Sequence, residues 1–126
     1  MGKAKGGWEE IYPEEINTKQ KWPSYIVLKP SYSTIYFSVR LTGEYFGDSN
    51  RVKIRYHQKA GILAFMPTRD PQHSYKISDN RTIKAKNVFN RLEVPLVENK
   101  SYFVRYNPET QWLEVNLNEE IKGERR

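Results

Sequence analysis

VKIRYHQKAGILAF, at residues 52–65, returns in altered form fifty residues later as YFVRYNPETQWLEV, at residues 102–115. In both stretches an Arg-Tyr pair precedes a polar turn, so that Arg55-Tyr56 corresponds to Arg105-Tyr106. Apolar and polar residues alternate on either side of the turn, which is typical of half-buried β-strands. The sequence therefore predicts the same β-hairpin twice in one chain.

The correspondence extends beyond the hairpins. Ser24-Tyr25 aligns with Ser74-Tyr75, and Thr34-Ile35 aligns with Thr82-Ile83. Each half predicts the order strand, strand, short helix, strand, strand. A unit of about 45 residues cannot cover its own sheet, so we expect the two halves to share one core. The predicted fold is mainly β with short helices, a small β-barrel built from two pseudo-symmetric ββαββ repeats.

The composition predicts three segments. Residues 1–23 mix Gly, Glu, Lys and Pro around isolated aromatic rings and are expected to form a flexible N-terminal arm. Residues 24–118 are expected to form a single barrel domain, with repeats at 24–67 and 74–117. The remaining residues, 119–126, are expected to form a frayed C-terminal tail.

Periodicity also predicts which side chains face the core. Ile35, Phe37 and Val39 fall on one face of a predicted strand, followed by a helix that ends near Gly47. In the second half, residues 87–94 predict a helix, and Lys84 and Lys86 point outward from the strand before it. The turn NPET at residues 107–110 connects the two strands of the closing hairpin.

Length and composition exclude several classes of protein. The 126-residue chain has no cysteine, which rules out disulfides and Cys-based metal or redox sites. No apolar run approaches the roughly 20 residues that cross a bilayer, so we expect a cytoplasmic protein without a membrane partner. The net charge is +6, and most of the surplus lies in residues 31–118. Such a surplus permits binding to nucleic acid, and it also aids solubility.

Catalytic signatures are missing from the sequence. His57 and His73 are the only two histidines, and neither has a carboxylate or second histidine at metal-ligand spacing. The seven glycines are scattered and form no phosphate-binding loop. We therefore expect neither enzymatic activity nor a metal or other cofactor.

The two copies share a layout with a known family. Residues 34–67 run strand, short helix, a turn at Gly47-Asp48, and hairpin, and residues 82–117 repeat this order with Val97-Glu98 at the turn. This layout resembles the AbrB-like proteins, which include the MazE antitoxins, and two copies in one chain resemble MraZ. The Ile-Pro pair that opens the helix in that family is missing from both copies. The resemblance implies a swapped-hairpin barrel that binds duplex DNA, often as a dimer, in transcription regulation or as an antitoxin.

Basic residues on the predicted strands and helices are the candidate DNA contacts. Arginine and lysine neutralise phosphates, and arginine also contacts guanine edges. Outward strand positions are commonly charged for solubility alone, and the sequence does not separate that role from binding. The candidates are Lys53 and Arg55 on one strand, Arg105 at the matching position, Lys84 and Lys86 on another strand, Arg51 in the loop before a strand, and Arg40 and Arg91 within the predicted helices.

Two other functions stay open. Phe103 shares an outward face with Arg105 in the predicted strand, which is the arrangement that stacks bases of a single strand. A structural or protein-interaction module, as in a mobile element or phage, fits the same composition without nucleic acid. The sequence also leaves open a homodimer and a separate protein partner.

Overall fold

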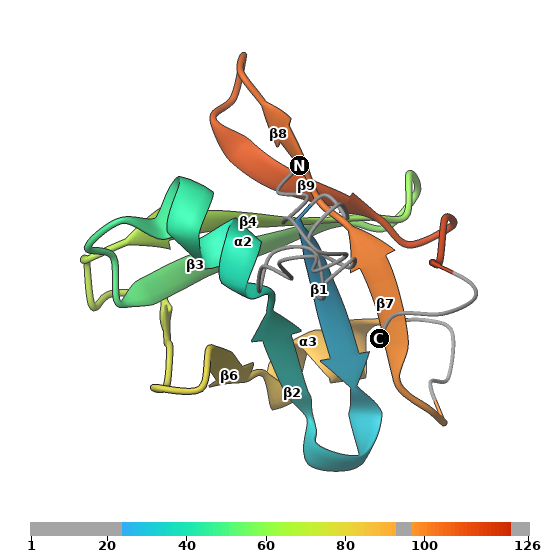
Figure 1. Ribbon diagram of the computed structural model, residues 1–126. Coiled ribbons are helices and arrows are strands. Elements are labelled where there is room, and N and C mark those ends of the chain that lie inside the picture. The colour runs from blue at the N-terminus through green and yellow to red at the C-terminus, as the bar shows by residue number, and fades with distance from the viewer. Residues whose placement is uncertain (1–23, 93–96, 122–126) are drawn as a thin grey trace, which may run out of the picture.

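A computed structural model describes residues 24–92 and 97–121, and within them the chain is mainly β with short helices. The strands form two antiparallel sheets (Figure 1). The four-stranded sheet has the order β6-β2-β1-β7, and the five-stranded sheet has the order β5-β3-β4-β9-β8. The strands are β1 (Tyr25–Lys29), β2 (Thr34–Phe37), β3 (Arg51–His57), β4 (Ile62–Thr68), β5 (Tyr75–Lys76), β6 (Thr82–Lys84), β7 (Lys100–Phe103), β8 (Arg105–Asn107) and β9 (Trp112–Asn116).

The expectation of a mainly β chain is thereby confirmed, whereas the strands described here form two sheets and not one closed barrel. At one side of the molecule the chain passes directly from β7 to β8, and so from one sheet to the other, at Val104. Val104 is buried, and its N–H donates to the Ser24 carbonyl at 2.9 Å. The two sheets are therefore continuous through this residue.

Short helices follow β2 and β6. Helix α2 (Val39–Leu41) continues into η4 (Thr42–Phe46), α3 spans Lys86–Arg91, and η3 is a single turn at Pro30–Tyr32. Ser38 begins α2 as its N-cap, with its hydroxyl accepting from the Leu41 N–H at 3.2 Å. The chain leaves η4 at Gly47, whose φ of 52° favours glycine. Val39 consequently lies in a helix and is 61% exposed, which corrects its predicted place on the buried face.

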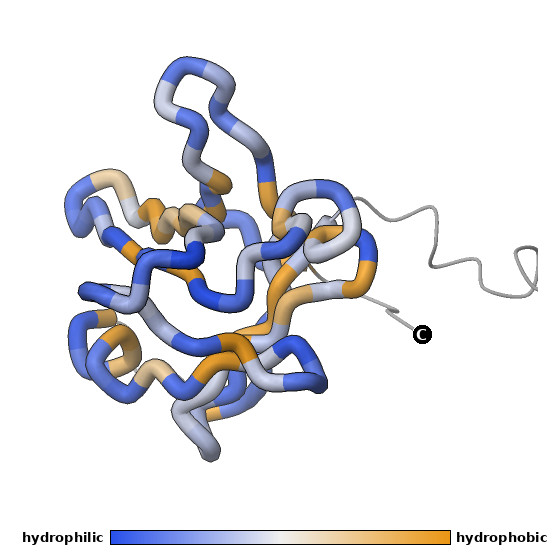
Figure 2. The backbone as a smooth tube through the Cα atoms, turned by 90° about the vertical axis from the view of Figure 1, so that its left-hand side faces the viewer, coloured by the Kyte–Doolittle hydropathy of each residue, from blue (hydrophilic) through white to orange (hydrophobic). Residues whose placement is uncertain are grey.

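The core lies where the two sheets face each other. Phe37 of β2 is fully buried, and its ring meets Phe65 of β4 edge-on at 5.4 Å and Phe46 of η4 at 5.2 Å. One ring thus joins both sheets and a helix. Figure 2 shows the same division along the backbone, with apolar segments inside and hydrophilic residues at the hairpin tips. Burial of such side chains stabilises a fold by about 1.5–3 kcal/mol each.

Several predicted boundaries need correction. Arg51 is the first residue of β3 and does not lie in the preceding loop. Lys86 begins α3 and does not continue β6. Within the predicted tail, Glu120 pairs with Tyr102, and the Ile121 N–H donates to the Ser101 carbonyl at 2.8 Å, whereas residues 122–126 lie outside the described residues. The predicted arm at 1–23 lies outside the described residues.

Candidate nucleic-acid interface

One row of residues crosses the five-stranded sheet on the face turned away from the core. Arg55 of β3 lies opposite Ala64 of β4, Ala64 lies opposite Glu114 of β9, and Glu114 lies opposite Arg105 of β8. Directly opposed residues of antiparallel strands point to the same face. Three strand spacings separate the two arginines, which is roughly 14 Å at the usual distance between strands. We call the side carrying this row the outer face.

A cation–π contact fixes Arg55 on the outer face. Its guanidinium lies over the Trp112 ring, 4.2 Å from the ring centroid. Trp112 belongs to β9, so the Arg55 side chain must cross β4 to reach it. Ala64 lies opposite Arg55 on β4 and is only 3% exposed. The contact places the guanidinium over the Trp112 ring, and the exposed Arg55 side chain can still donate to an anion.

Carboxylates accompany Lys53 and Arg105 on the outer face. Lys53 Nζ lies 3.6 Å from Asp70 Oδ2, and Arg105 Nη2 lies 3.8 Å from Glu119 Oε1. The Gln72 backbone N–H, and then the Lys53 charge, hold the pKa of Asp70 below its usual value. Both pairs are exposed, so each contributes little to stability. Phosphate oxygens can therefore replace the carboxylates at small cost.

Arg51 lies on the same face of β3 as Lys53 and Arg55, at the start of the strand. It donates to the Ser74 hydroxyl at 2.7 Å and to its carbonyl at 3.1 Å, so it ties β3 to the loop before β5. The other four basic candidates lie elsewhere. Arg40 pairs with Glu44 on its own helix. Lys84 is exposed on the four-stranded sheet, and Lys86 and Arg91 are exposed on α3. Of the eight basic residues predicted, the outer face brings together Arg51, Lys53, Arg55 and Arg105.

Phe103 does not share a sheet with Arg105. It lies on β7 opposite Tyr25, whereas Arg105 lies on β8 beyond the crossing between sheets. The middle of the Phe103 side of the four-stranded sheet is closed, since Val27 and Ser101 are each only 4% exposed. This face therefore offers less support for base stacking than the sequence pattern predicts.

Trp112 is the functional candidate that the sequence reasoning missed. In WLEVNL the apolar residues Leu113, Val115 and Leu117 alternate with Trp112, Glu114 and Asn116. This alternation assigns the tryptophan to the outward face, where a large ring indicates a partner. The signal was thus present in the strand pattern. The strand pattern does not predict that Arg55 lies over this ring, because Arg55 belongs to β3, which is two strands away from β9 in the sheet.

The chain has no match in any of three comparisons, with protein-family models, with curated proteins and with solved structures. Within residues 24–92 and 97–121 there is no helix long and apolar enough to cross a membrane. The same part of the chain contains no group of three or more His, Cys, Asp or Glu side chains suited to a metal ion. The interface is therefore described by its own geometry.

Proposed function

We propose that this protein binds duplex DNA through the outer face of its five-stranded sheet. The observation that carries the proposal is the row from Arg55 to Arg105, with the Arg55 guanidinium over the Trp112 ring. A guanidinium held in one place loses less conformational freedom when it binds a phosphate than a mobile one does. The net charge of +6 adds a general attraction to polyanions.

The covered Trp112 ring favours a duplex over a single strand. The backbones of Arg55 and Arg105 lie roughly 14 Å apart, but the Arg55 side chain crosses β4 toward β9, so the two guanidiniums lie closer together than that. They can then neutralise neighbouring phosphates. Trp112 is less suited to stacking an unpaired base, because Arg55 already covers its ring. A role in transcription regulation or as an antitoxin is part of the proposal and is supported by the AbrB-like layout.

We further propose that the two halves form one pseudo-symmetric, barrel-like unit. Strands at equivalent positions of the repeat pair with each other: Ile35 lies opposite Ile83, and β4 pairs with β9. Left-handed backbone conformations recur at equivalent positions as well. They occur at Ser33 and Arg81 after the first strand of each half, and at Gly61 and Gln111 in each hairpin turn. These correspondences support an internal duplication in which each copy completes the other.

Fluorescence anisotropy with a labelled duplex tests the DNA proposal. Each phosphate contact contributes about 0.9 to the slope of log affinity against log salt concentration. The double variant Arg55→Gln with Arg105→Gln should therefore bind more weakly and lower the slope by about 2. The matched control is Lys84→Gln with Lys86→Gln, which removes the same charge away from the outer face. If both variants lose the same affinity for DNA, the loss comes from net charge alone, which would contradict the proposed interface.

The second candidate is a protein-interaction module, and one edge of the five-stranded sheet favours it. Strand β3 pairs with β4 over its whole length, but β5 pairs only with Arg51 and Val52. Among the described strands, residues 53–57 thus have a neighbour on one side only. An added strand from a partner or a second copy of the chain can pair with such an edge. If the chain does not bind DNA at low salt but does associate with itself, the result favours this function.

A further inference from the structure

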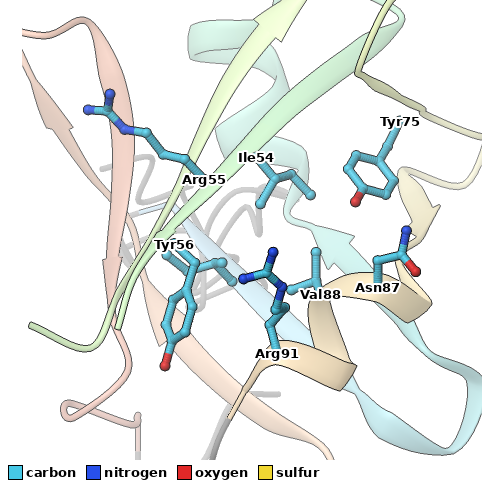
Figure 3. Close-up of a pocket in the computed structure, with 8 residues that line it drawn as sticks. Ile54, Arg55, Tyr56, Tyr75, Asn87, Val88 and Arg91 are labelled. Carbon is cyan, nitrogen blue, oxygen red and sulfur yellow. The ribbon is translucent and has the colours of Figure 1, made fainter. Parts of the chain in front are cut away.

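A cavity of about 420 Å³ lies between α3 and the core-facing side of β3. Ile54 and Val88 give it an apolar wall, and Tyr56, Tyr75, Asn87 and Arg91 bring polar groups to it. Figure 3 shows the Arg91 guanidinium directed from α3 toward β3, between Tyr56 and Val88, while Arg55 points away on the other side of the strand. Arg55 also lines the cavity, so the cavity borders the outer face at this residue, while its other polar groups lie on the core-facing side of β3 and on α3 and β5.

The four polar side chains of the cavity have no polar partner among the residues that the structure describes. Within residues 24–92 and 97–121, Tyr56, Tyr75, Asn87 and Arg91 make no side-chain hydrogen bond or ion pair, and no carboxylate of these residues lines the cavity. The polar groups come from three separate elements, β3, β5 and α3, and all four can donate a hydrogen bond to an anion. Converging polar groups beside an apolar wall are typical of a ligand site.

The other Arg-Tyr pair indicates the shape of the ligand. Tyr106, which corresponds to Tyr56 in the repeated sequence, is covered by the ring of Tyr45 at 5.3 Å and an interplanar angle of 19°. Tyr45 comes from η4, the helical segment of the first half. At Tyr56 no ring from the described residues stacks, and the helix of the second half contributes Arg91 beside an open cavity. Among the described residues, a ring thus fills in one half the place that no ring fills in the other.

We propose that this cavity binds an unpaired nucleotide, with the base against Tyr56 and the phosphate on Arg91. A planar ring occupies the position that Tyr45 has over Tyr106, and the apolar wall covers it. Asn87 offers both a donor and an acceptor to the base edge. The volume of about 420 Å³ falls in the range of about 300–1,000 Å³ found for small-molecule sites. This site goes beyond the outer face and does not depend on duplex binding.

Isothermal titration calorimetry of the full chain with adenosine monophosphate, cytidine monophosphate, adenosine and inorganic phosphate tests the site. Both nucleotides should bind, while adenosine and phosphate alone should each bind at least about tenfold more weakly, because each lacks one of the two contacts. No nucleotide binding at millimolar concentration would overturn the proposal. Inorganic phosphate binding as tightly as the nucleotides would also overturn it.

Three single variants assign the contacts. Arg91→Gln should weaken nucleotide binding about tenfold or more and leave adenosine binding unchanged. Tyr56→Leu should weaken nucleotides and adenosine alike, with circular dichroism verifying the fold. Lys86→Gln is the matched control, since it removes one positive charge from the same helix outside the cavity. Equal effects of Arg91→Gln and Lys86→Gln would refute a specific phosphate contact.

A last arm identifies the source of the nucleotide. A duplex with one unpaired 5′-phosphorylated nucleotide is compared with the same blunt duplex. If the ligand is a strand end, the overhang should strengthen binding to the natural chain and not to Arg91→Gln. If the ligand is a free nucleotide, the overhang has no effect while mononucleotides still bind. The slope of log affinity against log salt concentration, measured with the blunt duplex, tests the outer face alone. The experiments can therefore show that one site is wrong while the other is right.

Discussion

Phe37 should be the residue whose shortening most weakens the contact between the two sheets. The side chain is fully buried and touches Phe65 in the other sheet and Phe46 in the helix at ring distances of 5.4 and 5.2 Å. Phe37→Ala removes the ring and leaves a cavity, which costs about 3–5 kcal/mol of unfolding free energy. Phe37→Leu retains most of the volume and loses two aromatic pairs, at about 0.5–1.5 kcal/mol each. Urea unfolding followed by circular dichroism measures both losses.

A surface ring pair is the control for this prediction. Tyr45 and Tyr106 stack at 5.3 Å but are 40% and 42% exposed, so Tyr45→Leu should cost less than Phe37→Leu. A double-mutant cycle between Phe37→Leu and Phe65→Leu should give a coupling energy of about 0.5–1.5 kcal/mol. If Phe37→Leu costs no more than Tyr45→Leu, or the cycle shows no coupling, Phe37 does not join the sheets as argued.

Three further substitutions test local features, each by urea unfolding. Ser38→Ala removes a buried cap that accepts from Leu41 at 3.2 Å, and should cost about 1–2 kcal/mol. Gly61→Ala places a Cβ 2.9 Å from Asn118 Nδ2 at a φ of 68°, and should cost about 1–2 kcal/mol. Burial, and then the Glu120 charge, raise the pKa of Tyr102. Stability present below pH 10 should therefore fall as pH rises through the folded pKa, and Tyr102→Phe should reduce that fall.

The strand pattern predicted much of the local structure. Val52 is buried and Arg55 is exposed on β3, as the alternation indicated, and Ile83 and Lys84 divide in the same way on β6. Helices followed β2 and β6 where the period changed. These features are local in sequence, so an apolar period of two residues for a strand or 3.6 residues for a helix predicts them directly.

The assignment of strands to sheets was not predictable from the same pattern. Phe103 and Arg105 are two residues apart, so an unbroken strand would place them side by side on one face. The chain instead changes sheets at buried Val104, a residue that satisfies the alternation of both strands. Val39 was misplaced for a related reason: it continues the alternation of β2, but the Ser38 cap has already begun a helix. Apolar periodicity does not record such bends.

The two Arg-Tyr pairs of the chain have different surroundings in the structure. Arg55 lies over Trp112 while Tyr56 borders an open cavity, whereas Arg105 pairs with Glu119 while Tyr106 stacks on Tyr45. If the proposed duplication served only the fold, neither difference would be needed, because neither ring and neither arginine is among the buried core residues. The first pair therefore combines a guanidinium that lies over a ring with a tyrosine beside a cavity. Both residues of the second pair already contact other side chains of the protein. We therefore expect substitutions at the first Arg-Tyr pair to affect binding more than the same substitutions at the second.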